Sequence, residues 1–121
     1  MKSQYVFDKR KHYLALVITG EYDKEEFMSY PKMILEEAEK ENVNKVLIDI
    51  LQLKGTDIPI MDRFFIAEKI AAQIGGKVKL AIAWPKEHIN KFAETVAVNR
   101  GGLMNVVHTV DAAQEWLLND N

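Results

Sequence analysis

The amino-acid sequence predicts an α/β domain with a mainly parallel sheet of about five strands and about four helices. Three observations predict this fold class. Strand-like and helix-like segments alternate from residue 45 onward, two neighbouring β-rich runs precede them, and glycine pairs follow two of the expected helices. The chain has 121 residues without a linker, a repeat or a low-complexity segment. We therefore expect residues 1–121 to form a single domain.

Two runs rich in β-branched and aromatic residues open the chain, at residues 4–8 and 12–19. The charged stretch Lys9-Arg10-Lys11 between them suits a solvated turn, so the spacing predicts an antiparallel hairpin. Residues 13–19 are nearly all apolar, and such a strand is expected to be covered on both faces. Gly20 ends this strand.

The first helix is expected over residues 24–41. Asp23 and Glu26 have the spacing of a capping box, in which side chains bind helix N–H groups that have no partner within the helix. Pro31 interrupts the segment because proline has no backbone N–H to donate. The helix therefore either kinks at Pro31 or restarts near Ser29, and the sequence leaves both alternatives open.

Three strand–helix pairs complete the predicted fold. Their strands are expected at residues 45–51, 78–84 and 105–110, and their helices at residues 59–74, 86–100 and 111–118. Gly75-Gly76 and Gly101-Gly102 lie just past helix ends, where glycine accepts the left-handed conformation that closes a helix. Asp111 is expected to cap the last helix. This alternation implies crossover connections and parallel strand pairing.

The composition argues against several classes of function. Lys and Arg number 16 against 18 Asp and Glu, so the net charge of −2 creates no long-range field that would attract nucleic acid. The absence of cysteine excludes disulfides, thiolate metal sites and cysteine nucleophiles. The sequence has no signal-peptide core and no apolar run near the ~20 residues that span a bilayer. We expect a soluble cytoplasmic protein.

Motifs for catalysis and metal binding are not found in the sequence. The histidines are His12, His88 and His108. They are far apart, and no two of them have the spacing that places imidazoles on one helix face. Ser3 and Ser29 lack the Gly-x-Ser-x-Gly context of a hydrolase nucleophile, and Gly75-Gly76-Lys77 lacks the rest of a phosphate-binding loop. We expect no metal, no cofactor and no enzymatic activity.

Two acidic residues follow the strand expected at residues 45–51. Asp49 and Asp57 could form a carboxylate pair for acid–base or metal chemistry, because open parallel sheets hold ligands at their carboxyl ends. The alternative is structural: Asp57 precedes Pro59 and suits a helix cap, and Asp49 meets a polar neighbour at the strand end. The structural alternative is the one we favour.

The segment at residues 58–74 has more apolar surface than packing on one sheet requires. Its polar arc contains only Asp62, Lys69 and Gln73, and the apolar residues spread over roughly half the circumference. These are Ile60, Met61, Phe64, Phe65, Ala67, Ala71, Ala72 and Ile74, with Ile66 beside the polar arc. This excess could contact a partner protein, an apolar ligand or a membrane surface. Alternatively, neighbouring helices or a homodimer bury it.

Arg100 stands beside the glycine pair Gly101-Gly102. Its guanidinium could reach an anion or an acidic partner, because arginine presents a fork of donors. Cations also favour helix C-termini simply by complementing the helix dipole. The structural alternative is again the one we favour.

The order of elements resembles the STAS domains of anti-sigma factor antagonists and sulfate transporter tails, above all their SpoIIAA-like relatives. The most specific part is the strand Val46-Leu47-Ile48-Asp49-Ile50 and the stretch that follows it to Asp57. The segment from Phe92 to Gly102 and the last helix, with its Trp116-Leu117 ending, are similar to the SpoIIAA-like branch. The resemblance covers nearly the whole chain and implies a STAS-like fold.

The chain departs from the family where relatives carry a phosphorylatable Ser or Thr after the second Asp. Here Ile58-Pro59-Ile60 follows Asp57, and none of these side chains can accept phosphate. Thr56 is the nearest hydroxyl, but it precedes Asp57 and is a weak substitute. The resemblance therefore implies a regulatory fold without the usual phosphoserine switch.

The leading hypothesis is a non-catalytic STAS-like module that acts by protein–protein association. The expected binding surface consists of Asp49, Asp57, Ile58, Ile60, Met61, Phe64, Phe65 and Arg100. The alternative is a carrier or sensor of a small apolar or lipid-like ligand, with residues 58–74 as a lid or as a membrane-surface contact. A homodimer is compatible with either hypothesis.

Overall fold

The computed structural model describes residues 2–119, and within them the chain forms one mixed sheet of five strands. The strands are β1 (Ser3–Lys9), β2 (Leu14–Gly20), β3 (Lys45–Asp49), β4 (Lys79–Ala83) and β5 (Leu103–Val107). They lie side by side in chain order. β1 and β2 pair antiparallel, and every later pair is parallel. The predicted α/β fold class and its N-terminal hairpin are confirmed.

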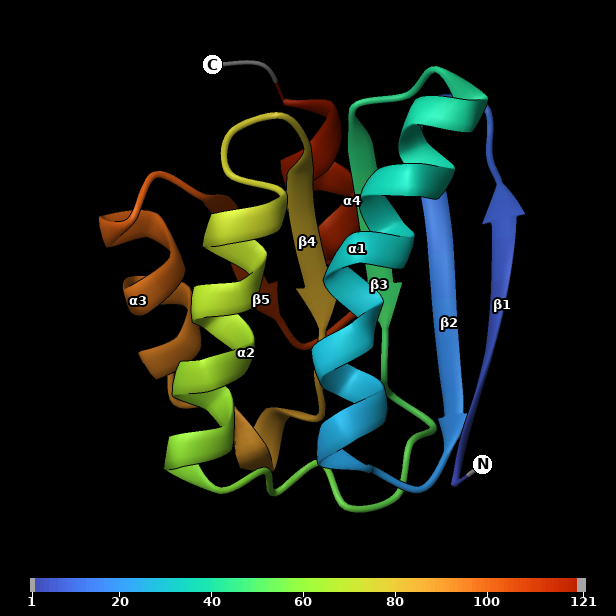
Figure 1. Ribbon diagram of the computed structural model, residues 1–121. Coiled ribbons are helices and arrows are strands. Elements are labelled where there is room, and N and C mark those ends of the chain that lie inside the picture. The colour runs from blue at the N-terminus through green and yellow to red at the C-terminus, as the bar shows by residue number, and fades with distance from the viewer. Residues whose placement is uncertain (1, 120–121) are drawn as a thin grey trace.

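Four α-helices cover the sheet within the described residues. They are α1 (Lys24–Glu41), α2 (Ile60–Gln73), α3 (Phe92–Asn99) and α4 (Val110–Leu118). α1, α2 and α3 lie on one face, and α4 lies on the other (Figure 1). No helix within residues 2–119 is long and apolar enough to cross a lipid bilayer.

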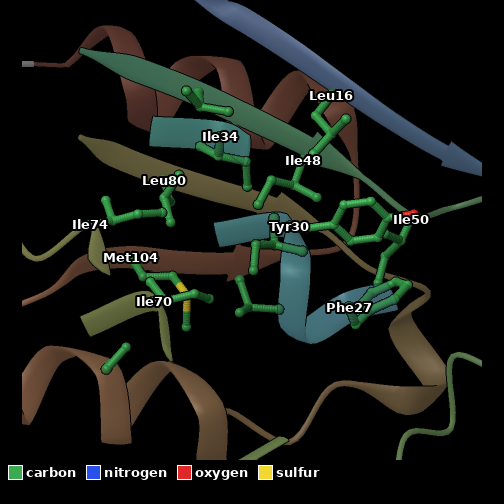
Figure 2. Close-up of a cluster of buried hydrophobic side chains, with 14 of the residues drawn as sticks. Leu16, Phe27, Tyr30, Ile34, Ile48, Ile50, Ile70, Ile74, Leu80 and Met104 are labelled. Carbon is green, nitrogen blue, oxygen red and sulfur yellow. The ribbon is translucent and has the colours of Figure 1, made fainter. Parts of the chain in front are cut away.

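The larger hydrophobic core lies between the sheet and the layer of α1, α2 and α3. Figure 2 shows side chains of both layers meeting there: Leu16, Phe27, Tyr30, Ile34, Ile48, Ile50, Ile70, Ile74, Leu80 and Met104. A smaller core under α4 consists of Tyr13, Ala15, Leu47, Ala81, Ala113 and Leu117. Side chains alternate between the faces of a strand, so β2 contributes to both cores. The carboxyl end of β2 is less covered than predicted, because Val17 and Thr19 are only half-buried.

α1 runs through Pro31 as one helix. Asp23 caps it, because a carboxylate oxygen of Asp23 accepts a hydrogen bond from the Glu26 N–H at 3.0 Å. Ser29 does not start a new helix, since its hydroxyl donates to the Glu26 carbonyl at 2.6 Å instead of accepting from the next turn. The restart alternative is therefore wrong. Pro31 itself is buried against the core.

The helix predicted over residues 86–100 is wrong in its first half. A single 3-10 turn, Lys86–His88, is followed by an extended residue, Ile89, and by Lys91 in the left-handed conformation at φ 61°. α3 begins only after this break. Two polar contacts stabilise this break. The Phe92 N–H donates to the Asn90 side chain at 3.0 Å, and the Lys91 ammonium donates to the Val106 carbonyl.

The cap of α4 also differs from the prediction. Thr109 is the N-cap, and its hydroxyl accepts from the Ala112 N–H at 3.0 Å, whereas Asp111 lies in the first turn. A cap needs extended backbone before the helix, and Thr109 has it at φ −139° and ψ 155°. The predicted glycine stops are confirmed for Gly75 and Gly101, whose φ values are 56° and 93°.

Candidate binding site

A buried arginine lies near the carboxyl ends of β3 and β4, where open α/β sheets hold their ligands. Arg63, in the first turns of α2, is only 4% exposed. Its Nε donates to the Ile58 carbonyl at 2.6 Å, and its Nη1 donates to the His88 carbonyl at 2.9 Å. Burial lowers the pKa of Arg63, and the charge of Asp57 opposes this shift. The cation thus ties the loop before α2 to the 3-10 turn after β4.

Thr56 and Trp84 contact the same group of residues: Trp84 packs against Arg63, and Thr56 bonds to His88. The Trp84 indole N–H donates to the Thr56 carbonyl at 2.9 Å, and the Thr56 hydroxyl shares a hydrogen bond of 2.8 Å with His88 Nδ1. Thr56 is buried. Its hydroxyl is therefore not an accessible phosphate acceptor in this structure.

The two carboxylates singled out in the sequence have separate partners. Asp49 accepts from the Leu51 N–H at 3.0 Å, a local turn at the end of β3. The side chain of Asp57 is 84% exposed, and its nearest cation is Arg63, at 4.0 Å from Oδ1 to Nη2. Asp57 does not cap α2, because the N-cap is Pro59 and no side chain binds the first N–H groups. The predicted cap is therefore wrong.

The apolar residues of α2 divide between core and surface. Ile58 is buried, and Phe64 is half-buried against the core, so these two members of the expected binding surface point inward. Ile60, Met61 and Phe65 are 49%, 59% and 37% exposed. These three residues are called the α2 apolar patch below. Met61 and Phe65 are one helical turn apart, so they share a face.

Charged side chains of the neighbouring helices border the α2 apolar patch. The Lys24 ammonium lies 5.2 Å from the centroid of the Phe65 ring and 3.9 Å from an oxygen of Asp62. On the other side, Arg100 pairs with Glu68 at 3.5 Å and lies over the Phe64 ring at 5.4 Å. A shallow surface hollow continues along α2 from Phe65 toward α1 and α3. The structure thus places Arg100 beside α2, whereas Asp49 lies at the carboxyl end of the central strand β3 and Asp57 lies in the loop that follows it.

A small cavity lies behind the same helix, inside the larger core. Its volume is about 60 Å³, and its walls come from α1, α2 and the sheet, with Pro31, Ala67 and Met104 among them. Arg63 and Trp84 also line it. Small-molecule pockets are usually about 300–1,000 Å³, so this cavity holds at most a very small molecule unless α2 moves.

Sequence reasoning missed the part played by Arg63. The signal was its position: Arg63, Ala67, Ile70 and Ile74 recur at helical spacing, and the last three are core residues. A cation on such a face predicts a buried charge with backbone partners. Within residues 2–119, no three His, Asp or Glu side chains are grouped closely enough to hold a metal ion.

A solved structure of similar fold covers almost the whole length of this chain. It is the crystal structure of an uncharacterized protein from the DUF3478 family, with a SpoIIAA-like fold, from Shewanella loihica PV-4. The match has a TM-score of 0.58, covers 95% of this chain and 93% of that chain, and has 19% sequence identity. It shows that the chain has a SpoIIAA-like fold, as the sequence predicted. No family model and no curated protein match the sequence.

Proposed function

We propose that the chain is a non-catalytic binding module that associates with a protein partner through the α2 apolar patch. The observation that carries this proposal is the exposure of Ile60, Met61 and Phe65 on the first half of one helix. Large apolar side chains that gather at a surface and are rimmed by charge are typical of protein–protein contacts. Lys24, which lies over the Phe65 ring, and Arg100, which lines the same surface hollow as Phe65, provide that rim.

Features of the loop before α2 support binding rather than phosphorylation. Ile58 anchors the loop in the core, and the buried Arg63 holds the Ile58 carbonyl. The start of α2 is therefore held in place before any partner arrives, which reduces the entropy cost of association. The fold match adds nothing on function, because one fold serves many functions.

Capture of partner proteins from native lysate tests the proposal. Three purified, tagged proteins serve as bait: wild type, Phe65→Glu and Val98→Glu. Val98 is an exposed apolar residue of α3 and serves as the matched control. We expect one partner to be enriched by wild type and by Val98→Glu, and to be lost with Phe65→Glu. Phe64→Glu is less suitable, because Phe64 packs against the core and its replacement would disturb the fold.

Two outcomes would contradict the association proposal. One is a partner that binds Phe65→Glu as tightly as wild type in a titration with purified components. The other is the absence of any partner that distinguishes Phe65→Glu from Val98→Glu. Thermal melting of the three proteins establishes that they are equally folded.

A second candidate function, binding of a small apolar or lipid-like molecule, is favoured by the cavity behind α2. A lipid-sized ligand would require α2 to move outward as a lid, because the present volume is about 60 Å³. Native mass spectrometry should then detect a bound lipid-sized mass in wild type. Ala67→Val narrows the cavity without touching the exposed patch, so it should reduce ligand binding and leave partner capture intact.

A further inference from the structure

The outer edge of β1 presents backbone groups that face away from the sheet. Lys2 and Arg10 bond across to β2: the Lys2 carbonyl accepts from Glu21, and the Arg10 N–H donates to Tyr13, both at 2.9 Å. In an antiparallel pair the bonded residues alternate, so the even-numbered residues of β1 face β2. The N–H and C=O groups of Tyr5, Phe7 and Lys9 therefore point outward. The Ser3 N–H also points outward, and Glu26 accepts it at 2.8 Å.

On the opposite edge of the sheet, the outward groups of Val106 in β5 are bound by side chains. On β5, the Val106 N–H donates to a Glu94 carboxylate oxygen at 2.9 Å, and the Val106 carbonyl accepts from the Lys91 ammonium. Both side chains come from α3 and its N-cap. Natural proteins cover or charge the edges of their sheets in this way because an open edge pairs with other strands. Tyr5 and Phe7 of β1 have no comparable cover among the described residues.

We propose that β1 is a dimerisation edge, on which a second copy of this chain pairs antiparallel with Val6 on the two-fold axis. Tyr5 then lies opposite Phe7 of the second copy, and each of these pairs exchanges both N–H···O=C bonds. The two sheets join into one continuous sheet. The proposal uses a different surface from the α2 apolar patch and is independent of the proposed function.

The side chains of β1 are complementary to themselves in this register. Tyr5 is 40% exposed and already packs edge-on against Phe7, with ring centroids 5.9 Å apart. Opposite Phe7 of the second copy it extends this aromatic row across the axis. Lys9 of the second copy lies opposite Ser3, beside the carboxylate of Glu26 that binds the Ser3 N–H and hydroxyl. Lys9 already pairs with Glu41 of its own chain at 3.6 Å, so the second copy adds Glu26 as a further acidic neighbour at each end of the aromatic row.

Neighbouring registers of the homodimer fit less well, which favours the axis at Val6. A two-fold axis at Phe7 places Val6 opposite Asp8, an apolar residue against a charge. An axis at Tyr5 places Val6 opposite Gln4, an apolar residue against a polar amide, and leaves Lys9 without an opposite residue in β1. Of these three axes, only the one at Val6 places every outward-facing residue of β1, from Ser3 to Lys9, opposite another residue of β1. At each solvated end of the paired strands, Lys2 lies opposite Arg10 of the second copy, which is a like-charged pair. Asp8 binds Arg10 there at 2.8 Å.

Cysteine cross-linking tests the register directly, because the chain has no cysteine of its own. Residues directly opposite in a non-hydrogen-bonded pair have Cβ atoms about 4.5 Å apart, close to disulfide geometry. Val6→Cys should form a disulfide-linked dimer under mild oxidation. Leu103→Cys, on the exposed side of β5, is the matched control and should stay monomeric on a non-reducing gel.

Charge substitution at Val6 tests the same axis without oxidation. Val6 is 63% exposed, so a charged side chain leaves the monomer folded. In sedimentation, Val6→Lys and Val6→Glu should each be monomeric and their mixture dimeric, with wild type and Phe65→Glu also dimeric. The proposal is overturned by a monomeric wild type, by a dimer that Val6→Lys leaves unchanged, or by cross-linking of Leu103→Cys that equals that of Val6→Cys.

Discussion

The guanidinium carbon of Arg63 lies 4.6 Å from the centroid of the Trp84 ring, and both side chains donate to the loop that leads into α2. Trp84 binds the Thr56 carbonyl and Arg63 binds the Ile58 carbonyl. One side chain comes from α2 and the other follows β4. Together they fix the loop that precedes the α2 apolar patch.

Arg63→Lys should destabilise the protein although it keeps the charge. Lysine cannot reach two carbonyls with a planar fork or stack on an indole in the same way, so a buried cation loses partners. Hydrogen bonds to charged groups are worth about 1.5–3 kcal/mol, and we expect a loss of about 2–3 kcal/mol in the free energy of unfolding. Urea denaturation measures it.

Arg100→Lys is the matched control for that substitution. Arg100 is exposed and its partner Glu68 is also accessible, so the change should cost less than about 1 kcal/mol. Equal losses for the two variants would contradict the structural part assigned to Arg63.

Ser3→Ala should weaken the pH dependence of stability. Hydrogen bonds from the Ser3 hydroxyl and N–H lower the pKa of Glu26 in the folded protein. A lowered folded-state pKa contributes stability above the ordinary carboxyl range, and this contribution is lost as the pH falls through the folded pKa. Ser3→Ala removes the hydroxyl contribution, so the Glu26 pKa should rise toward its ordinary value.

The measurement is an NMR titration of Glu26 together with melting temperatures between about pH 7 and pH 3. The difference in melting temperature between wild type and Ser3→Ala should be largest near neutral pH and shrink in acid. Ser29→Ala is the control, because the Ser29 hydroxyl bonds only the backbone carbonyl of Glu26 and the sulfur of Met33. A difference that grows in acid would show that the sign is wrong.

Thr109→Ala should destabilise α4 more than Asp111→Ala does. The Thr109 hydroxyl is the cap that accepts from the Ala112 N–H, and loss of a cap costs about 1 kcal/mol. Asp111 acts only through its charge in the first turn, which is worth about 0.3–1 kcal/mol and is screened by salt. Thermal unfolding at low and high salt separates the two, and the reverse order would restore Asp111 as the cap.

The candidate site was only partly predictable from the sequence. The periodicity of residues 58–74 indicated an apolar surface on α2, and Ile60, Met61 and Phe65 are exposed. The same periodicity could not separate Phe64 and Ile58 from them, because inward and outward positions of an apolar helix carry the same residue types. Which of these side chains are buried in the core depends on where the sheet lies relative to α2.

By itself the sequence determined the α/β fold, the order of its elements and the glycine stops at Gly75 and Gly101, since these follow from local periodicity and backbone preference. Tertiary structure alone decided that Thr56 is buried, that Arg63 and Trp84 hold the loop before α2, and that side chains of distant segments bind Val106 at the β5 edge. Each of these depends on side chains from distant segments. Whether a side chain is buried or paired depends on the residues that folding brings next to it. The local sequence pattern does not show which residues those are.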